Sequence, residues 1–479
     1  MTKHFTIAIL LTLAFAVTAA AQDADLVIGA ATLGMGAGNL KTLQYSGPAT
    51  EYSFGQAFNP KTSWPEFKNK TYTRTIDYDM PAIRIDRVAE PIEPGRKGGG
   101  LAPAATQTIV VGANTAWGQQ LEIWKTPFGF LKAAKANKAT RSYKTVGGKK
   151  YTVLSFTAPT KAKVNGYFND QYMLEKVETW IDNAVTGDTL LEVTYSGYKD
   201  FNGVKFPTLI SEKQAGLATL NFPVTDVKVN QAAGIQAPQN RGGAPAGGGA
   251  AAQGPAATSQ KLGDGVYMIL PGYAAIAVDF KDGIMIIEGP QSEARGNAII
   301  TEAKRVIPNK PIKYVVNTHI HFDHSSGLRA FVAEGATILT HQINKGYWEK
   351  MLATPHSLNP DRQETAKKKI SVQTFGDKKV FTDGNHVVEL HRLQGGLHQE
   401  GMIVAYLPKE KVLLEADAFN PPAQANAPAA TPPAPATVNL VLNIERLKLD
   451  VETIVPVHYP ADGRKVTKAE LMKAAGRGQ

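Results

Sequence analysis

The chain has 479 residues, of which 43% are hydrophobic and 20% charged, as in a folded soluble protein with two or three domains. It contains no cysteine, which excludes disulfides, a thiol nucleophile, a cysteine-linked lipid anchor and cysteine-ligated zinc. The net charge of +10 comes without a basic run or a nucleic-acid motif. The charge therefore indicates solubility, or secondarily a weak attraction for anionic substrates, and no nucleic-acid partner is expected.

The first 21 residues have the organisation of a signal peptide. Lys3 precedes an apolar run from Phe5 to Val17, and Ala19 and Ala21 stand in the A-x-A spacing that signal peptidases accept. The run is shorter than the ~20 residues that span a bilayer, so cleavage after Ala21 is favoured over an uncleaved membrane anchor. The sequence predicts an exported bacterial protein, periplasmic or secreted, without stable membrane insertion.

Residues 22–230 alternate between short strand-like segments and turn residues. Segments 141–156, 173–193 and 190–212 each place strands around a turn, at Gly147–Gly148, at Gly187 and at Gly203. This part is predicted to be a predominantly antiparallel β-domain, which a loose segment at 93–106 interrupts.

The meander that ends in YSGYKDFNGVKFP resembles the curved half-barrel domains of periplasmic lipoprotein carriers, over about half of its length. The resemblance implies a concave apolar face for a lipid or a partner. The alternative is a β-rich accessory module that only helps to position the next domain.

Residues 231–260 are rich in Gly, Ala, Pro and Gln, as in a flexible linker. After the linker, the hydrophobic pattern of residues 261–479 changes from strands alone to strands and helices. Strands joined at Asp282–Gly283 precede a helical pattern over 292–308, a buried strand over 311–318, a helix over 327–335 and a later helix over 439–449. Strands that alternate with helices predict an α/β domain.

The buried strand runs directly into NTHIHFDHSSG, which holds three of the ten histidines of the chain. His319 and His321 are two positions apart and project to one side of an extended chain, whereas Asp323 and His324 follow a turn and address a second point. Neutral imidazole and carboxylate are ligands for zinc, and paired metals lie ~3.5 to 4 Å apart. A two-metal site then demands further ligands at later strand ends.

Three later strands supply such residues. His398 follows a Gly-Gly turn, Asp417 follows the strand over 412–414, and His458 follows the strand over 454–457. With these residues, the chain from 261 to 479 resembles the metallo-β-lactamase superfamily of hydrolases, whose H-x-H-x-D-H signature stands at His319 to His324. The resemblance implies an αββα sandwich with a metal pair at one edge of its two sheets.

The resemblance also implies a ligand set of seven residues. His319, His321 and His398 would hold the first metal, Asp323, His324 and His458 the second, and Asp417 would bridge them. The family often has G-H-[ST] at the third histidine, where this chain has Gly396, Leu397, His398 and Gln399. That departure leaves the geometry of the loop open.

The predicted function is a binuclear zinc hydrolase, with iron or manganese as alternatives to zinc. Two cations would generate a bridging hydroxide near neutral pH that attacks an ester, lactone, thioester or phosphoester bond of a small molecule. The resemblance assigns Asp323 as the catalytic residue that holds the hydroxide and moves its proton.

Two alternatives remain at this point. A β-lactamase is disfavoured because members that cleave β-lactams usually lack a carboxylate at the position of Asp417. A periplasmic lipid- or protein-binding module with a structural metal is disfavoured because structural zinc sites close with four protein ligands. Sequence alone does not distinguish a lid from an inert insertion at 421–436, nor does it give the oligomeric state.

Lone histidines and aromatics are more often structural than functional. His341, His356, His386 and His391 are therefore not expected to be ligands. Five aromatic residues near strand ends are expected to pack in the core, with lining of a substrate pocket as the alternative: Phe322, Tyr347, Trp348, Phe419 and Tyr459.

Overall fold

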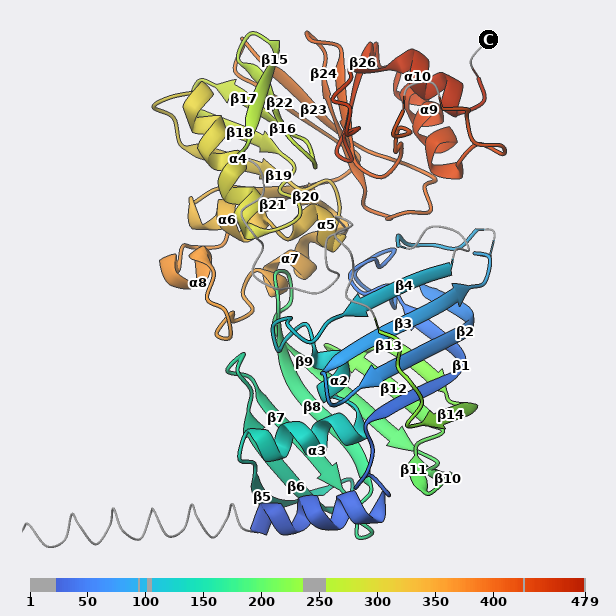
Figure 1. Ribbon diagram of the computed structural model, residues 1–479. Coiled ribbons are helices and arrows are strands. Elements are labelled where there is room, and N and C mark those ends of the chain that lie inside the picture. The colour runs from blue at the N-terminus through green and yellow to red at the C-terminus, as the bar shows by residue number, and fades with distance from the viewer. Residues whose placement is uncertain (1–22, 94, 101–105, 236–255, 425–426, 478–479) are drawn as a thin grey trace, which may run out of the picture.

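The computed structural model describes residues 23–93, 95–100, 106–235, 256–424 and 427–477 (Figure 1). The expected signal peptide at 1–21 and most of the expected linker lie outside these residues. Strand β15 begins at Thr258, so the last three residues of the expected linker already belong to the second half. Among the described residues, no helix has the length and apolar character needed to cross a membrane.

The first half of the described chain is built on one antiparallel sheet of twelve strands, in the order β4-β3-β2-β1-β13-β12-β9-β8-β7-β6-β5, with β14 paired to β1. This confirms the predicted β-rich class. The strands are β1 (Thr42–Tyr52), β2 (Glu66–Asp77), β3 (Ala82–Ala89), β4 (Thr106–Val111), β5 (Thr140–Val146), β6 (Lys149–Thr157), β7 (Lys163–Phe168), β8 (Leu174–Asn183), β9 (Gly187–Ser196), β12 (Leu209–Gln214), β13 (Leu217–Pro223) and β14 (Asp226–Val229).

The turns follow the glycines of the sequence. Val146 pairs with Lys149 around Gly147–Gly148, where both glycines have the positive φ that a tight hairpin needs. The hairpin predicted around Gly203 is also present. Next to the turn β10 (Lys199–Phe201) pairs with β11 (Val204–Phe206), and further from it β9 pairs with β12 in the same register.

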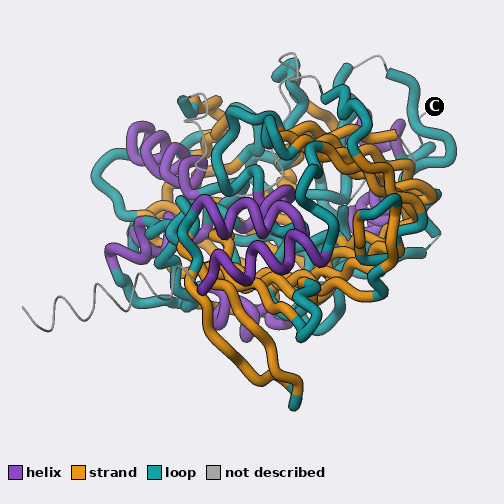
Figure 2. The backbone as a smooth tube through the Cα atoms, turned by 60° about the horizontal axis from the view of Figure 1, so that its bottom comes forward, coloured by secondary structure: helices purple, strands orange, loops and turns teal. Residues whose placement is uncertain are grey.

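Helices cover one face of this sheet and fill its core. They are α2 (Leu121–Trp124), α3 (Pro127–Ala136) and a helical segment over 23–34, none of which was predicted. Two of them run side by side across the strands in Figure 2. Thr126 caps α3 by accepting a hydrogen bond from Gly129 N at 3.2 Å, and Pro127 occupies its first turn.

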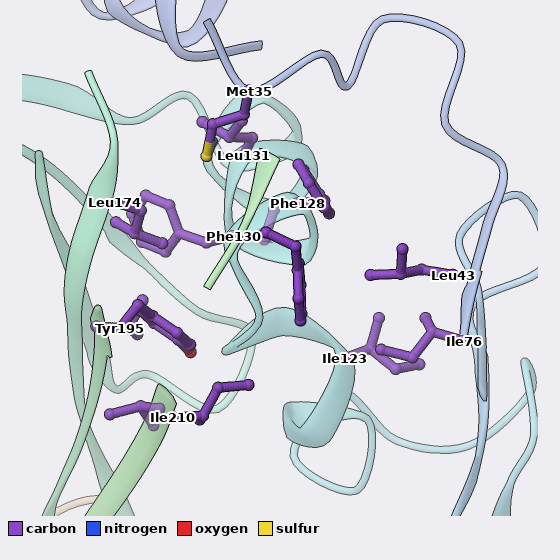
Figure 3. Close-up of a cluster of buried hydrophobic side chains, with 14 of the residues drawn as sticks. Met35, Leu43, Ile76, Ile123, Phe128, Phe130, Leu131, Leu174, Tyr195 and Ile210 are labelled. Carbon is purple, nitrogen blue, oxygen red and sulfur yellow. The ribbon is translucent and has the colours of Figure 1, made fainter. Parts of the chain in front are cut away.

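The core between helices and sheet is apolar and close-packed (Figure 3). Phe130 from α3 is fully buried there and lies against Gly166, where a Cβ would approach its Cζ to 2.3 Å. This face of the sheet is therefore occupied by the chain's own helices. The resemblance to lipoprotein carriers stays a prediction.

The second half contains two sheets. One has the order β15 (Thr258–Gly263), β16 (Val266–Leu270), β17 (Ala275–Phe280), β18 (Gly283–Ile287), β19 (Ile312–Val316), β20 (Thr337–His341) and β21 (Val372–Phe375). The other has the order β22 (Lys378–Thr382), β23 (Val387–Arg392), β24 (Ile403–Leu407), β25 (Val412–Glu415), β26 (Thr453–Pro456) and β27 (Val466–Thr467).

Helices lie outside both sheets, which confirms the predicted αββα sandwich. Strands such as β18 and β24 are buried at every position because one face meets the other sheet and the opposite face meets helices. The helices are α4 (Glu293–Val306), α5 (Phe322–Ser325), α6 (Leu328–Ala333), α7 (Lys345–Met351) and α8 (Arg362–Ala366) with the first sheet, and α9 (Pro435–Leu447) and α10 (Lys468–Ala474) with the second.

The two halves meet through an aromatic clasp of Phe54, Trp64 and Phe322. Phe54 lies edge-on to Trp64 and to Phe322, with ring centroids 5.1 and 5.2 Å apart. Gly55 adopts a φ of +82° beside Phe322, where a Cβ would come within 2.4 Å of the ring. The clasp holds the loop after β1 against the HIHFDH segment.

The clasp generates a stability prediction for this loop. Removal of the Trp64 ring by Trp64→Ala deletes two edge-to-face contacts, so amide hydrogen exchange over residues 53–59 should accelerate by about tenfold. Trp117→Ala is the matched control because Trp117 stacks on Trp124 instead. Equal exchange over 53–59 in the parent and Trp64→Ala would show that the clasp does not order the loop.

Candidate metal centre

Strand ends of both sheets deliver the predicted ligands to one place. The HIHFDH segment follows β19, Asp417 follows β25, and His458 follows β26. His398 lies on the connection between β23 and β24. The ligands that follow β19, β25 and β26 therefore start from buried, rigid strands, whereas His398 lies on a loop.

Hydrogen bonds fix the path of the loop after β19. Asn317 donates from Nδ2 to the carbonyl oxygen of His319 at 2.7 Å, and Trp348 donates from Nε1 to Asn317 Oδ1 at 3.0 Å. Ser325 donates from Oγ to the carbonyl oxygen of His321 at 2.7 Å. Buried side chains therefore replace the strand ladder where the loop leaves the sheet.

The structure brings all seven predicted residues together in two groups. Within each group one donor atom per residue lies within 4.8 Å of the others, and Asp417 belongs to both. The groups are His319, His321, His398 and Asp417, and Asp323, His324, Asp417 and His458.

Asp417 lies at the centre of the arrangement. Its Oδ2 is 3.2, 3.0 and 2.9 Å from Nε2 of His319, His324 and His398, and its Oδ1 is 2.8 Å from His458 Nε2. His324 and His458 also face each other with Nε2 atoms 3.2 Å apart. Imidazole nitrogens that converge in this way present several lone pairs to one small volume, which a cation stabilises.

The hydrogen-bonding state of the imidazole nitrogens also fits a bound cation. Nδ1 of His321 is buried without a hydrogen-bond partner in the described part of the chain, and Nε2 of His319 and of His398, also buried, approach the Asp417 carboxylate without the geometry of a hydrogen bond. A buried polar atom without a partner costs about 1–3 kcal/mol. Bonds of roughly 2.0–2.2 Å to zinc would satisfy these nitrogens, and the imidazole and carboxylate donors also suit iron or manganese.

Contacts on the far side of the rings set which nitrogen is available. His321 Nε2 lies 3.0 Å from the carbonyl oxygen of Ala57, which only accepts, so Nε2 carries the proton and Nδ1 keeps its lone pair. The Nδ1 atom of His319 lies 3.1 Å from Thr318 Oγ1, which leaves Nε2 facing Asp417. A backbone carbonyl of the first half thus orients a predicted ligand of the second.

Burial and charge keep two histidines neutral and two carboxyls ionised, which are the forms that bind a metal. Burial, together with neighbouring imidazoles, lowers the pKa of His319 to about 3 and that of His321 well below its usual value. Burial opposes ionisation of Asp323 and Asp417, but His324 beside them holds the pKa of both carboxyls well below the ordinary range. Burial disfavours the cationic form of His324, but the two carboxylates beside it raise its pKa well above normal. A cation bound by His324 would have to displace that proton.

Asp323 is held by two neighbours that sequence analysis did not identify. Gln56 donates from Nε2 to Asp323 Oδ1 at 3.0 Å, and Tyr273 donates from its hydroxyl to Oδ2 at 3.1 Å. The Tyr273 ring also lies 4.4 Å from that of His458. Neither residue stands in a motif.

The first half also holds the loop of the third histidine. Gly98 donates from its amide to the carbonyl oxygen of Leu397 at 2.8 Å, and Glu400 donates from its amide to that of Phe58 at 2.8 Å. Asn59 donates to the Glu400 carboxylate at 2.7 Å. His398 therefore reaches its group even though its flanking residues depart from the family pattern.

A cavity of about 340 Å³ opens beside the two groups. Both halves line it, through Gln56, Arg96, Gly98, Gly99, Gly100, Asp323, His398, Asp417, Asn420 and His458. The segment at 93–106, predicted to be a loose interruption, thus supplies part of the wall. The run of three glycines permits this close backbone approach, although the same run is also typical of an exposed loop.

The remaining candidates lie elsewhere. The five aromatics are not among the lining residues; Phe419 and Trp348 are almost fully buried. No described residue of 421–436 lines the cavity. Neither group contains the other four histidines, which contact structural partners, as His386 does with the carbonyl oxygen of Asp264: His341, His356, His386 and His391.

Comparison with known proteins agrees with this geometry. The family profile described as the metallo-beta-lactamase superfamily matches residues 265–458. Residues 265–458 form a metallo-beta-lactamase superfamily domain. A linear primary-alkylsulfatase from a Pseudomonas species is 25% identical over 229 residues, which cover 40% of this chain and 43% of that protein. The chain thus matches less than half the length of this relative.

Solved structures with similarity to the chain include metallo-beta-lactamases from Pontibacter korlensis and Hirschia baltica. They are each 19% identical, with TM-scores of 0.34 and 0.33, and cover 46% of this chain and 98% and 97% of their own.

Gly99 allows a test that removes no donor atom. A Cβ at this position would lie 2.2 Å from Gln56 Oε1 and 2.9 Å from His321 Nδ1, with no positive φ to add backbone strain. Gly99→Ala should weaken zinc binding by about 10- to 100-fold, as disturbance of groups around a ligand does. Zinc content after equilibration with zinc buffers measures the effect. Gly112→Ala is the control, because its Cβ would meet nothing within 4 Å. Parent-like zinc affinity in Gly99→Ala would contradict the prediction.

Proposed function

We propose that this protein is an exported binuclear zinc hydrolase that cleaves an ester-type bond of a small molecule. One observation carries the proposal, namely that two groups of histidine and aspartate donors share the carboxylate of Asp417. The candidate bonds are those of esters, lactones, thioesters and phosphoesters, and the alkylsulfatase relative adds sulfate esters. Export rests on the signal-peptide pattern that ends at Ala21.

The chain's own residues divide the work. His319, His321 and His398 would hold one cation, Asp323, His324 and His458 the other, and Asp417 both. Two bound divalent cations would polarise the bond under attack and lower the pKa of water. Asp323 is the more accessible carboxylate, with 33% of its side chain exposed against 10% for Asp417. It is therefore the group that meets substrate and accepts a proton, while Gln56 and Tyr273 fix its orientation.

The open cavity disfavours a binding module with a structural metal. Structural zinc sites are closed by four protein ligands, whereas these groups border a cavity of about 340 Å³. A β-lactamase remains the rival within the family, and hydrolysis of a chromogenic cephalosporin at an efficient rate would support it.

Metal content is the first test. The mature chain, residues 22–479, purified without chelator, should contain close to two metals, because the donors form two groups. His319→Ala should lose metal, whereas His386→Ala, outside both groups, should not. Elemental analysis per mole of protein measures this. A parent that binds no metal even with added zinc would refute the proposal.

Asp323→Ala tests the catalytic assignment. Loss of this carboxylate should lower kcat by about 100-fold or more, since a positioned proton acceptor contributes 10²- to 10⁴-fold. Turnover is measured on the best substrate from a panel of 4-nitrophenyl acetate, phosphate and sulfate, a lactone and a thioester. Circular dichroism should show an unchanged fold. Normal turnover in this variant would remove Asp323 from the mechanism.

A further inference from the structure

Two loops of the first half form one wall of the cavity. The first, residues 53–65, joins β1 to β2. The second joins β3 to β4, and its residues 95–100 border the cavity, at the edge of the lower sheet that faces the upper half (Figure 1). The first loop contributes Gln56, whose amide is committed to Asp323. The second contributes Arg96 and three glycines.

Arg96 is the one residue with a permanent positive charge among the described residues that line the cavity. Its guanidinium lies 4.5 Å from the ring centroid of Phe67, and Nη1 donates to the carbonyl oxygen of Gly99 at 3.1 Å. The side chain is half-buried, and its Nε is buried without a hydrogen-bond partner. No carboxylate in the described ranges forms an ion pair with it.

Arg96 therefore carries a charge that no carboxylate of the described residues balances. Burial lowers the pKa of Arg96 below its usual value, yet a guanidinium keeps its charge near neutral pH. A partly desolvated cation is stabilised by an anion, and arginine presents a planar fork that matches oxyanions. The ring of Phe67 and the carbonyl of Gly99 hold the fork in place without neutralising it.

The charge of the whole cavity points in the same direction. Gln56, Asn420 and the glycines are neutral, and the carboxylates of Asp323 and Asp417 belong to the predicted metal ligands. Two divalent cations would outweigh two carboxylates, and Arg96 would add a further positive charge. The cavity would then favour a negatively charged occupant.

We propose that Arg96 determines substrate specificity and that the substrate carries an oxyanion group, such as sulfate, phosphate or carboxylate, at or beside the bond under attack. The proposal rests on the proposed hydrolase function and narrows its substrate class to anionic esters. It also makes the first half a contributor to substrate binding.

Anion binding tests the proposal without knowledge of the natural substrate. Inorganic phosphate and sulfate are titrated by calorimetry into the zinc-loaded full mature chain. Arg96→Gln should bind both about 10- to 100-fold more weakly, since it loses a charge-assisted hydrogen bond. Arg96→Lys, which keeps the charge but not the fork, should fall between. Lys97→Gln is the matched control, because Lys97 is exposed, lies over the Phe58 ring and does not line the cavity.

Turnover supplies the second arm of the test. The ratio of kcat/KM for an anionic to a neutral 4-nitrophenyl ester should fall at least about tenfold in Arg96→Gln, mainly through KM. Arg96→Lys should restore part of this ratio. Lys97→Gln should keep the ratio of the parent.

The outcomes separate the two proposals. Parent-like anion affinity in Arg96→Gln, or no anion binding by the zinc-loaded parent, overturns the role of Arg96 while a full metal content leaves the hydrolase proposal standing. Equal weakening in Arg96→Gln and Lys97→Gln also overturns it, because a general loss of positive charge would then be the cause. A parent without metal overturns the proposed function itself.

Discussion

The carboxylate of Asp417 is the contact on which the candidate site depends. It approaches imidazoles from three separate parts of the second half, so it joins the loop after β19 to the edge of the other sheet. Its own position is set by buried Glu415, which accepts hydrogen bonds from the amides of Ala418 and Phe419 at 3.0 and 2.9 Å. A displacement of this turn would alter both donor groups at once, since they have Asp417 in common.

Sequence patterns predicted the features that depend on residues close together in the chain. Apolar strands followed by His or Asp indicated the seven donors, and helical periodicity indicated α4 and α9, because both signals are contained within a few residues. The same logic predicted the hairpin of β5 and β6 from its two glycines. It missed α2, α3 and the helical segment over 23–34, which depend on packing against the sheet.

The contribution of the first half was beyond such patterns. Ala57 meets His321 across a separation of 264 residues, and Gln56 meets Asp323 across 267. An alanine carbonyl or a glutamine amide has no sequence signature, and a loop rich in glycine is equally typical of an exposed linker and of a close backbone approach. Only the assembled fold distinguishes the two. The sequence indicated at most an accessory module that helps to position the next domain. In the structure, loops of this half orient His321, Asp323 and the loop of His398.

The long separation of these partners also has a kinetic consequence. Contacts between residues 264 and 267 positions apart form only after most of the chain has ordered, because closing so large a loop costs entropy before any contact compensates for it. Each half has its own apolar core and can gather its own strands first. The orientation of His321 by Ala57 is then among the last events of folding. A partly folded chain would contain all of its histidines, but the ring of His321 would not yet be oriented for metal binding.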